Sequence, residues 1–141
     1  MDLEQRRILR TSIPGPASQI LHSRRQQVVS SGVGALLPVY IDGADGAIMR
    51  DVDGNQFIDL GSGIGVVTIG HTNQQVVDAV SKQANHFTHT LFTVTPYEPY
   101  VRAAELLTAN MKGDFPKKAA FFVTGAEALE NVVKIARLAT G

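Results

Sequence analysis

The stretch AAFFVTGAEALENVVKIARLATG, residues 119–141, passes from an apolar run into a helical pattern through Thr124-Gly125. The five residues 119–123 show no alternation of apolar and polar types, which is typical of a strand covered on both faces in a parallel sheet. From Gly125 onward apolar residues recur at helical spacing, so we predict a helix over 125–139. A buried strand followed directly by a helix indicates an α/β fold.

The junction at Thr124-Gly125 has two possible meanings. A helix that starts directly after a strand leaves backbone N–H groups unpaired beyond the carboxyl end of the strand, where open α/β sheets bind ligands. Gly125 would let a phosphate approach the backbone, and Thr124 would add a hydroxyl group. Alternatively, Thr124 only caps the helix and Gly125 only turns the chain. The spacing of a Walker phosphate loop is absent.

Two patterns precede this stretch. Ser18 is the predicted N-cap of a helix over 19–31, and glycines at 32 and 34 follow it. Residues 37–60 then alternate short apolar runs with three Asp-Gly pairs, at 42–43, 45–46 and 53–54. Asp-Gly favours tight turns because glycine accepts positive φ, so the segment predicts a small antiparallel meander.

The middle of the chain predicts two further helices. A glycine-rich connection occupies 61–72, and Asn73 can cap a helix over 74–87. A second helix is predicted over 95–111, with its prolines confined to the first turn, where they are tolerated. The predicted order is therefore helix, meander, helix, helix, strand, helix.

The composition excludes several classes of protein. Hydrophobic residues make up 44% of the 141 residues and charged residues 18%, as in a folded globular chain. Thirteen basic residues balance thirteen acidic ones, so no charge excess points to nucleic acid or to a membrane surface. Without cysteine, a secretory signal or a long apolar run, the sequence predicts a cytoplasmic protein with no nucleic-acid or membrane partner.

Four segments in order resemble the class III pyridoxal-phosphate aminotransferases. FFVTGAEALENVVKIARLATG (121–141) is similar to the family's segment that binds the cofactor phosphate, and DVDGNQFIDLGSGIGVVTIGH (51–71) to its stretch leading to the substrate pocket. FTHTLFTVTPYEPY (87–100) and GPASQILHSRRQQVVSSGVGALLPVY (15–40) resemble the 4-aminobutyrate branch of the family. The resemblance therefore covers nearly the whole chain.

The resemblance implies the N-terminal part of a fold type I pyridoxal-phosphate-dependent transferase, of the α/β class. Residues 1–72 would belong to the small domain, with its helix and antiparallel meander. Residues 73–141 would begin the large domain, which is built on a parallel sheet. The implied activity is transfer of the amino group of 4-aminobutyrate to 2-oxoglutarate by a homodimer that carries pyridoxal 5'-phosphate.

Five positions match functional positions of the family. Thr124, Gly125 and Ala126 correspond to the start of the phosphate cup, where Gly125 and Ala126 would offer backbone N–H groups. Ile64 matches an apolar residue that contacts the substrate chain. Thr93 falls where some relatives have a glutamine near the cofactor.

The sequence departs from the family pattern at the phosphate cup and at two other places, and the latter two affect the substrate assignment more than the family assignment. Ala126 stands where many relatives have a serine, so one hydroxyl donor is missing. Leu91 stands where many have a cysteine, and His71-Thr72-Asn73 replaces the commoner His-x-His-Pro. Another ω-amino acid, as in the ornithine-type enzymes, therefore remains an alternative substrate.

The residues that carry the chemistry in this family have no counterpart in the sequence. The resemblance implies that the Schiff-base lysine, the aromatic residue on the cofactor ring and the aspartate on its nitrogen would follow residue 141. None of the five lysines has the family context of a Schiff base: Lys82, Lys112, Lys117, Lys118 and Lys134. We expect the chain alone to be inactive, and a non-catalytic remnant or interaction module is the alternative.

Two other sequence patterns are only weak indications of a binding site. GSGIG at 61–65 has part of a dinucleotide-binding fingerprint, but Val66 stands at the third glycine and the following residues are poor helix formers. His86 and His89 lie three residues apart, yet no third ligand stands at metal-binding spacing. We therefore predict neither a nicotinamide or flavin site nor a metal site.

Overall fold

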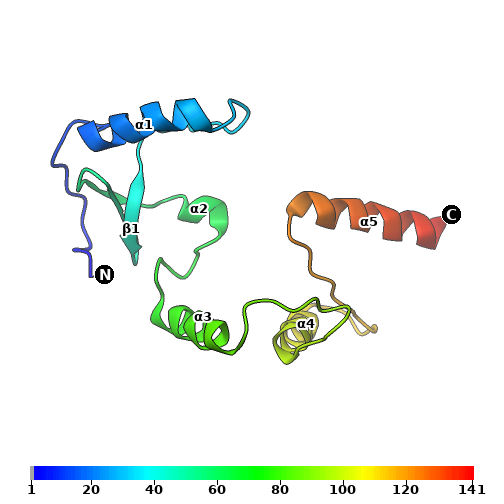
Figure 1. Cartoon of the computed structure of the whole chain (residues 1–141). Coiled ribbons are helices and arrows are strands. Elements are labelled where there is room, and N and C mark those ends of the chain that lie inside the picture. The colour runs from blue at the N-terminus through cyan, green and yellow to red at the C-terminus, as the bar shows by residue number, and fades with distance from the viewer. Residues whose placement is uncertain (1) are drawn as a thin grey trace. The chain divides into compact units, whose positions relative to one another are not determined.

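The computed structural model describes residues 2–141 and divides along the chain into two compact units, with the boundary between His86 and Phe87 (Figure 1). The first unit contains α1 (Pro16–Val28), β1 (Ile41–Asp45), β2 (Ile48–Asp51), β3 (Gln56–Ile58), α2 (Ser62–Gly65) and α3 (Gln74–His86). The second contains α4 (Glu98–Asn110) and α5 (Gly125–Thr140). The assignment of 1–72 to a small domain and of 73–141 to a large one stays a prediction.

The predicted meander is present as an antiparallel sheet in the order β1-β2-β3. Gly46 (φ 54°) and Gly54 (φ 81°) occupy the turns between the strands, as their Asp-Gly pairs predicted. The pair Asp42-Gly43 does not form a turn. It lies within β1 at a shift of register, and the Asp42 carboxylate accepts two hydrogen bonds of 3.0 Å from the Arg50 guanidinium of β2.

The predicted N-cap of α1 is wrong. The helix begins at Pro16, and Gly15 is its N-cap without a side-chain hydrogen bond. The Asp53 carboxylate caps the helix instead, accepting hydrogen bonds from the backbone N–H groups of Ala17 (2.7 Å) and Ser18 (2.9 Å). A side chain at Gly15 would collide with this carboxylate, since a Cβ there would lie 2.3 Å from Asp53 Cγ.

Buried polar side chains attach the N-terminal segment to the sheet. Asn55 is fully buried, and its Oδ1 accepts hydrogen bonds from the backbone N–H groups of Arg10 (2.7 Å) and Thr11 (3.0 Å). Its Nδ2 donates to Thr11 Oγ1 and to Asp51 Oδ2, at 2.9 and 2.8 Å. Ile48 of β2 is also buried. Both the oxygen and the nitrogen of the Asn55 amide group are therefore hydrogen-bonded.

Asn55→Ala should lower the free energy of unfolding by about 2 kcal/mol, because it leaves buried donors without acceptors. Urea unfolding of the protein that contains residues 1–141, monitored by circular dichroism, measures the loss. Asn85→Ala is the matched control, since Asn85 is exposed and makes one hydrogen bond, to the Ser81 carbonyl of its own helix. Equal losses in both variants would show that the buried network does not stabilise the fold.

Aromatic rings hold the second unit together. The rings of Phe92 and Tyr100 stack at 4.0 Å between centroids, and Tyr97 meets Phe92 edge-on at 5.3 Å. Phe121 contacts Tyr100 edge-on at 4.9 Å, and its backbone N–H donates to the Tyr100 hydroxyl at 3.0 Å. Tyr100 therefore fixes the segment before α5 to α4.

The predicted strand at 119–123 is absent. None of the strands among residues 2–141 lies outside the meander, and Val123 is 94% exposed rather than buried. A strand needs a neighbour with which to share backbone hydrogen bonds, and no described segment pairs with this one. The apolar pattern indicates burial on two faces, but within residues 2–141 Phe121, Phe122 and Val123 all stay exposed, even though the Phe121 ring contacts Tyr100.

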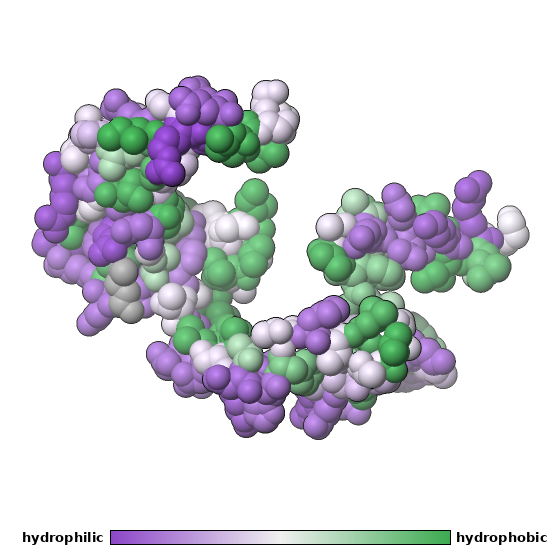
Figure 2. All heavy atoms as spheres, viewed as in Figure 1, coloured by the Kyte–Doolittle hydropathy of each residue, from purple (hydrophilic) through white to green (hydrophobic). Residues whose placement is uncertain are grey.

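The three predicted helices over 74–87, 95–111 and 125–139 are confirmed as α3, α4 and α5. Their apolar faces are largely uncovered. Figure 2 shows apolar and polar residues on opposite sides of α5, and Leu129, Val132 and Ile135 of its apolar side are each 60% exposed or more. The periodicity thus predicted the helices correctly, although it did not indicate what covers them.

Candidate functional site

The start of α5 is built around Thr124. This residue has extended backbone angles (φ −130°, ψ 154°), and its Oγ1 accepts a hydrogen bond from the Glu127 backbone N–H at 3.2 Å. Glu127 Oε2 in turn accepts from the backbone N–H groups of Val123 and Thr124, each at 3.1 Å. This reciprocal capping box confirms that Thr124 caps the helix.

The capping box leaves two backbone N–H donors at the start of α5 without acceptors. Within residues 2–141, the backbone N–H groups of Gly125 and Ala126 have no hydrogen-bond acceptor. Both residues are exposed, and a Cβ on Gly125 would meet no atom within 4 Å. These N–H groups lie at the positive end of a 16-residue helix, where an anion is stabilised. The two meanings of Thr124-Gly125 are therefore compatible.

Ile64 lies in the first unit, on α2. Its side chain is 98% exposed, and its backbone is left-handed (φ 62°, ψ 55°). The Asp59 carboxylate at the start of this loop accepts hydrogen bonds from the backbone N–H groups of Gly61 (2.9 Å) and Ser62 (2.8 Å). Its second oxygen lies 2.7 Å from His71 Nε2 at the end of the loop.

A cavity of about 300 Å³ lies beside this pair. Its lining residues come from the β1–β2 turn and from the loop: Gly46, Ala47, Asp59, Ser62, Val67, Thr68, Ile69, Gly70 and His71. The Asp59–His71 pair was not among the predicted site residues. Nothing in the local sequence indicates it, because the two partners are 12 positions apart.

The environment of Asp59 lowers the pKa of its carboxyl group. The hydrogen bond with His71 lowers that pKa most, burial opposes it, and the N–H groups of Gly61 and Ser62 lower it further. A carboxyl group with a lowered pKa stabilises the folded state fully above its ordinary pKa of about 4, and this contribution is lost as the pH falls through the folded value.

The melting temperature of the unchanged protein should therefore exceed that of Asp59→Asn at about pH 5, and this difference should shrink as the pH falls below about 4. Thermal unfolding of the protein that contains residues 1–141, followed at several pH values, measures this difference. An unchanged difference down to about pH 3 would show that the Asp59 charge does not stabilise the fold.

Thr93 lies in a turn of the second unit. The turn is closed by hydrogen bonds from the backbone N–H groups of Val94 and Thr95 to the Leu91 carbonyl, both of 2.8 Å. Thr93 is exposed, and no hydrogen bond joins it to Thr124, Gly125 or Ala126 within residues 2–141. The predicted cofactor residues thus share one helix start, whereas Ile64 and Thr93 lie elsewhere in the chain.

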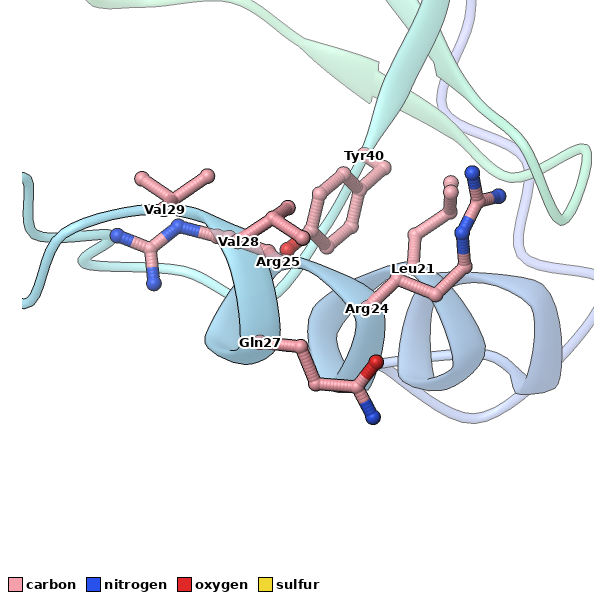
Figure 3. A pocket seen from close by; sticks show the side chains of 7 residues that line it. All are labelled: Leu21, Arg24, Arg25, Gln27, Val28, Val29 and Tyr40. Carbon is pink, nitrogen blue, oxygen red and sulfur yellow. The ribbon is translucent and has the colours of Figure 1, made fainter.

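A second cavity, of about 490 Å³, lies between α1 and Tyr40. Figure 3 shows the side chains of Arg24 and Arg25 pointing to opposite sides of the Tyr40 ring. The Tyr40 hydroxyl lies 3.3 Å from His22 Nδ1. Arg25 Nη2 is buried without a hydrogen-bond partner in the described part of the chain. The sequence did not predict this cavity.

A profile of the family described as "Aminotransferase class-III" matches residues 28–140. The chain belongs to this family. It is 58% identical over 139 residues to a 4-aminobutyrate aminotransferase of Mycobacterium tuberculosis, covering 99% of this chain and 31% of that protein. It is 44% identical over 124 residues to a 5-aminovalerate aminotransferase of Pseudomonas aeruginosa, covering 88% and 29%. The chain thus spans about a third of these relatives.

Solved aminotransferases share the fold. An ω-transaminase from Sphaerobacter thermophilus superposes with a TM-score of 0.77 at 27% identity, covering 88% of this chain and 28% of that one. An acetylornithine aminotransferase from Elizabethkingia anophelis gives 0.75 at 26% identity, covering 85% and 30%. The predicted fold class, the N-terminal part of a fold type I transferase, is confirmed. Across residues 2–141, no helix has the length and apolarity to cross a membrane.

Proposed function

We propose that this chain is the N-terminal part of a pyridoxal-phosphate-dependent transaminase that transfers the amino group of 4-aminobutyrate to 2-oxoglutarate. The observation that carries the proposal is the 58% identity to a 4-aminobutyrate aminotransferase over 139 residues. The 5-aminovalerate relative is less similar, at 44%. We further propose a cytoplasmic homodimer, on the resemblance of the sequence to the family.

The start of α5 fits a phosphate group. Gly125 and Ala126 present two backbone N–H groups without acceptors, and the space above Gly125 is open. The Thr124 hydroxyl accepts from Glu127 N–H, so its own proton remains free to be donated. A taurine:2-oxoglutarate aminotransferase from Bifidobacterium kashiwanohense, solved with pyridoxal phosphate and glutamate, shares the fold at a TM-score of 0.76 and 27% identity.

Three groups of this chain would therefore hold the cofactor phosphate: the Thr124 hydroxyl and the backbone N–H groups of Gly125 and Ala126. The positive end of α5 would stabilise the phosphate charge. Glu127 does not compete for these donors, because its carboxylate is bound to the N–H groups of Val123 and Thr124. When bound, pyridoxal phosphate supplies an electron sink for amino transfer.

The substrate side of the proposal rests on Ile64 and Thr93. The exposed Ile64 side chain would form an apolar wall against the carbon chain of the amino acid, and Thr93 would lie near the cofactor. We propose that the cofactor-binding lysine and the groups that bind substrate carboxylates lie outside residues 1–141.

An amino-transfer assay on the protein that contains residues 1–141 tests the proposal. The protein, loaded with pyridoxal phosphate, is given 2-oxoglutarate with 4-aminobutyrate, 5-aminovalerate or ornithine, and glutamate formation is measured. We expect the largest kcat/KM with 4-aminobutyrate. A larger value with ornithine would favour the ornithine-type alternative. No glutamate with any donor would favour a non-catalytic remnant.

Ile64→Gln should raise KM for 4-aminobutyrate about tenfold, because a polar amide replaces the apolar wall. Retention of the cofactor should be unchanged, since Ile64 is not among the phosphate-binding residues. Val66→Gln is the matched control, because Val66 is also exposed and lies two residues further along the chain. Loss of cofactor in Ile64→Gln would place this loop at the cofactor instead.

A further inference from the structure

The segment α2 is a single left-handed turn. Ser62, Gly63, Ile64 and Gly65 have φ values of 48°, 61°, 62° and 74°. Hydrogen bonds from Gly65 N–H to the Gly61 carbonyl (3.0 Å) and from Val66 N–H to the Ser62 carbonyl (2.8 Å) close it. Glycine adopts this conformation freely, but an L-residue does so at a cost, and a β-branched residue such as isoleucine is an outlier.

The conformation of Ile64 brings no benefit through burial. Its side chain is 98% exposed, so burial of the side chain does not offset the cost of the left-handed backbone. A residue stays in such a conformation only when its surroundings impose it, and such residues cluster at functional sites. The question is therefore which groups hold the turn.

Asp59 holds the beginning of the turn. Its Oδ1 accepts hydrogen bonds from the backbone N–H groups of Gly61 and Ser62, at 2.9 and 2.8 Å. Its Oδ2 lies 2.7 Å from His71 Nε2, and only 7% of the Asp59 side chain is exposed. One carboxylate thus joins the first residues of the turn to the end of the loop.

His71 is fixed in turn on the sheet. Its backbone N–H donates to the Gly46 carbonyl at 2.8 Å, and the Gly46 N–H donates to the His71 carbonyl at 3.1 Å. Gly70 (φ 91°) permits this approach, because a Cβ there would lie 3.3 Å from the Gly46 carbonyl oxygen. Thr72 Oγ1 adds a hydrogen bond of 3.0 Å to Asp45 Oδ1. The loop is therefore anchored on the β1–β2 turn.

We propose that Asp59, anchored through His71, is a positioning residue that imposes the left-handed turn at 62–65 and thereby fixes the Ile64 side chain as the wall that measures the length of the amino-acid substrate. The substrate part rests on the proposed function. Asp59 itself touches no substrate. It acts through the backbone N–H groups of Gly61 and Ser62 and through the imidazole of His71.

Hydrogen exchange in the protein that contains residues 1–141 tests the turn without any measurement of activity. In Asp59→Ala, the amides of Gly65 and Val66 should exchange about tenfold faster, because the turn that protects them opens more often. Asp59→Asn should restore part of the protection, since its amide oxygen can still accept from Gly61 and Ser62. Asp42→Ala is the matched control, as it removes a carboxylate from the same sheet without touching the loop. Unchanged exchange in Asp59→Ala would overturn the proposal.

A double-mutant cycle tests the substrate part. The ratio of kcat/KM for 4-aminobutyrate to that for 5-aminovalerate should fall about tenfold in Asp59→Ala and in Ile64→Ala, mainly through KM. Because Asp59 would act only through Ile64, the double variant should lose no more than either single variant. Additive losses would overturn the proposal. Absence of amino transfer with every donor would overturn the proposed function and the substrate part together, whereas the exchange result would still decide the role of Asp59 in the turn.

Melting temperatures of glycine variants test whether the left-handed backbone of Ile64 is strained. Ile64→Gly should raise the melting temperature, because glycine adopts the left-handed angles without cost, and it should also remove the discrimination between the two amino acids. Val66→Gly should lower the melting temperature, since Val66 has right-handed angles (φ −92°, ψ −51°). A lower melting temperature in Ile64→Gly would show that the turn imposes no strain.

Discussion

Gly125→Asp should weaken the binding of pyridoxal phosphate about a hundredfold, which corresponds to about 3 kcal/mol. The new carboxylate would stand at the open N–H groups of Gly125 and Ala126 and repel the phosphate that we place there. The substitution should not unfold the protein, because a Cβ at Gly125 meets no atom within 4 Å. An acidic side chain in the first turn of a helix is stabilising.

Two variants at the same position separate charge from size. Gly125→Asn has nearly the shape of Gly125→Asp without the charge, and Gly125→Ala adds only a methyl group. We expect cofactor affinity to decrease in the order Ala, Asn, Asp, as measured by equilibrium dialysis of pyridoxal phosphate. Full affinity in Gly125→Asp, with an unchanged melting temperature, would remove Gly125 from the phosphate site.

The start of α5 could be predicted because its geometry is local. Thr124 and Glu127 are three residues apart, and their capping box depends only on that spacing. The cap of α1 could not be predicted in the same way. Ser18 is a suitable capping residue, but the Asp53 carboxylate, 35 positions later, takes its backbone N–H group. A local pattern cannot show a cap that the tertiary structure supplies.

The loop that carries Ile64 shows the same limit. The glycines of GSGIG indicate a turn, but they do not predict that the isoleucine between them is left-handed as well, because isoleucine disfavours that conformation. The carboxylate of Asp59 and the imidazole of His71 become neighbours only when β1 and β2 pair and bring Gly46 to His71. The residues were visible in the sequence, whereas their contact depends on the sheet.

The absence of the predicted strand at 119–123 bears on how the isolated chain should behave. An unbroken apolar run predicts a strand with neighbours, and the described residues provide none. Val123 is 94% exposed, and Leu138 of α5 is 89% exposed. A large uncovered apolar surface and unpaired backbone groups favour association between chains.

Residues 1–141 expressed alone should therefore aggregate or unfold only partly cooperatively, and they should show no amino transfer. The apolar sides of α5 and of 119–123 would associate with those of other copies. The phosphate donors at Gly125 and Ala126 would bind pyridoxal phosphate at best weakly, because no lysine of the chain has the family context that the cofactor needs.

Size-exclusion chromatography, a thermal melt and an assay with 4-aminobutyrate and 2-oxoglutarate measure these properties. A cooperative, monomeric melt would contradict the first expectation. Turnover above background would contradict the second, because one of the five lysines would then have to serve the cofactor.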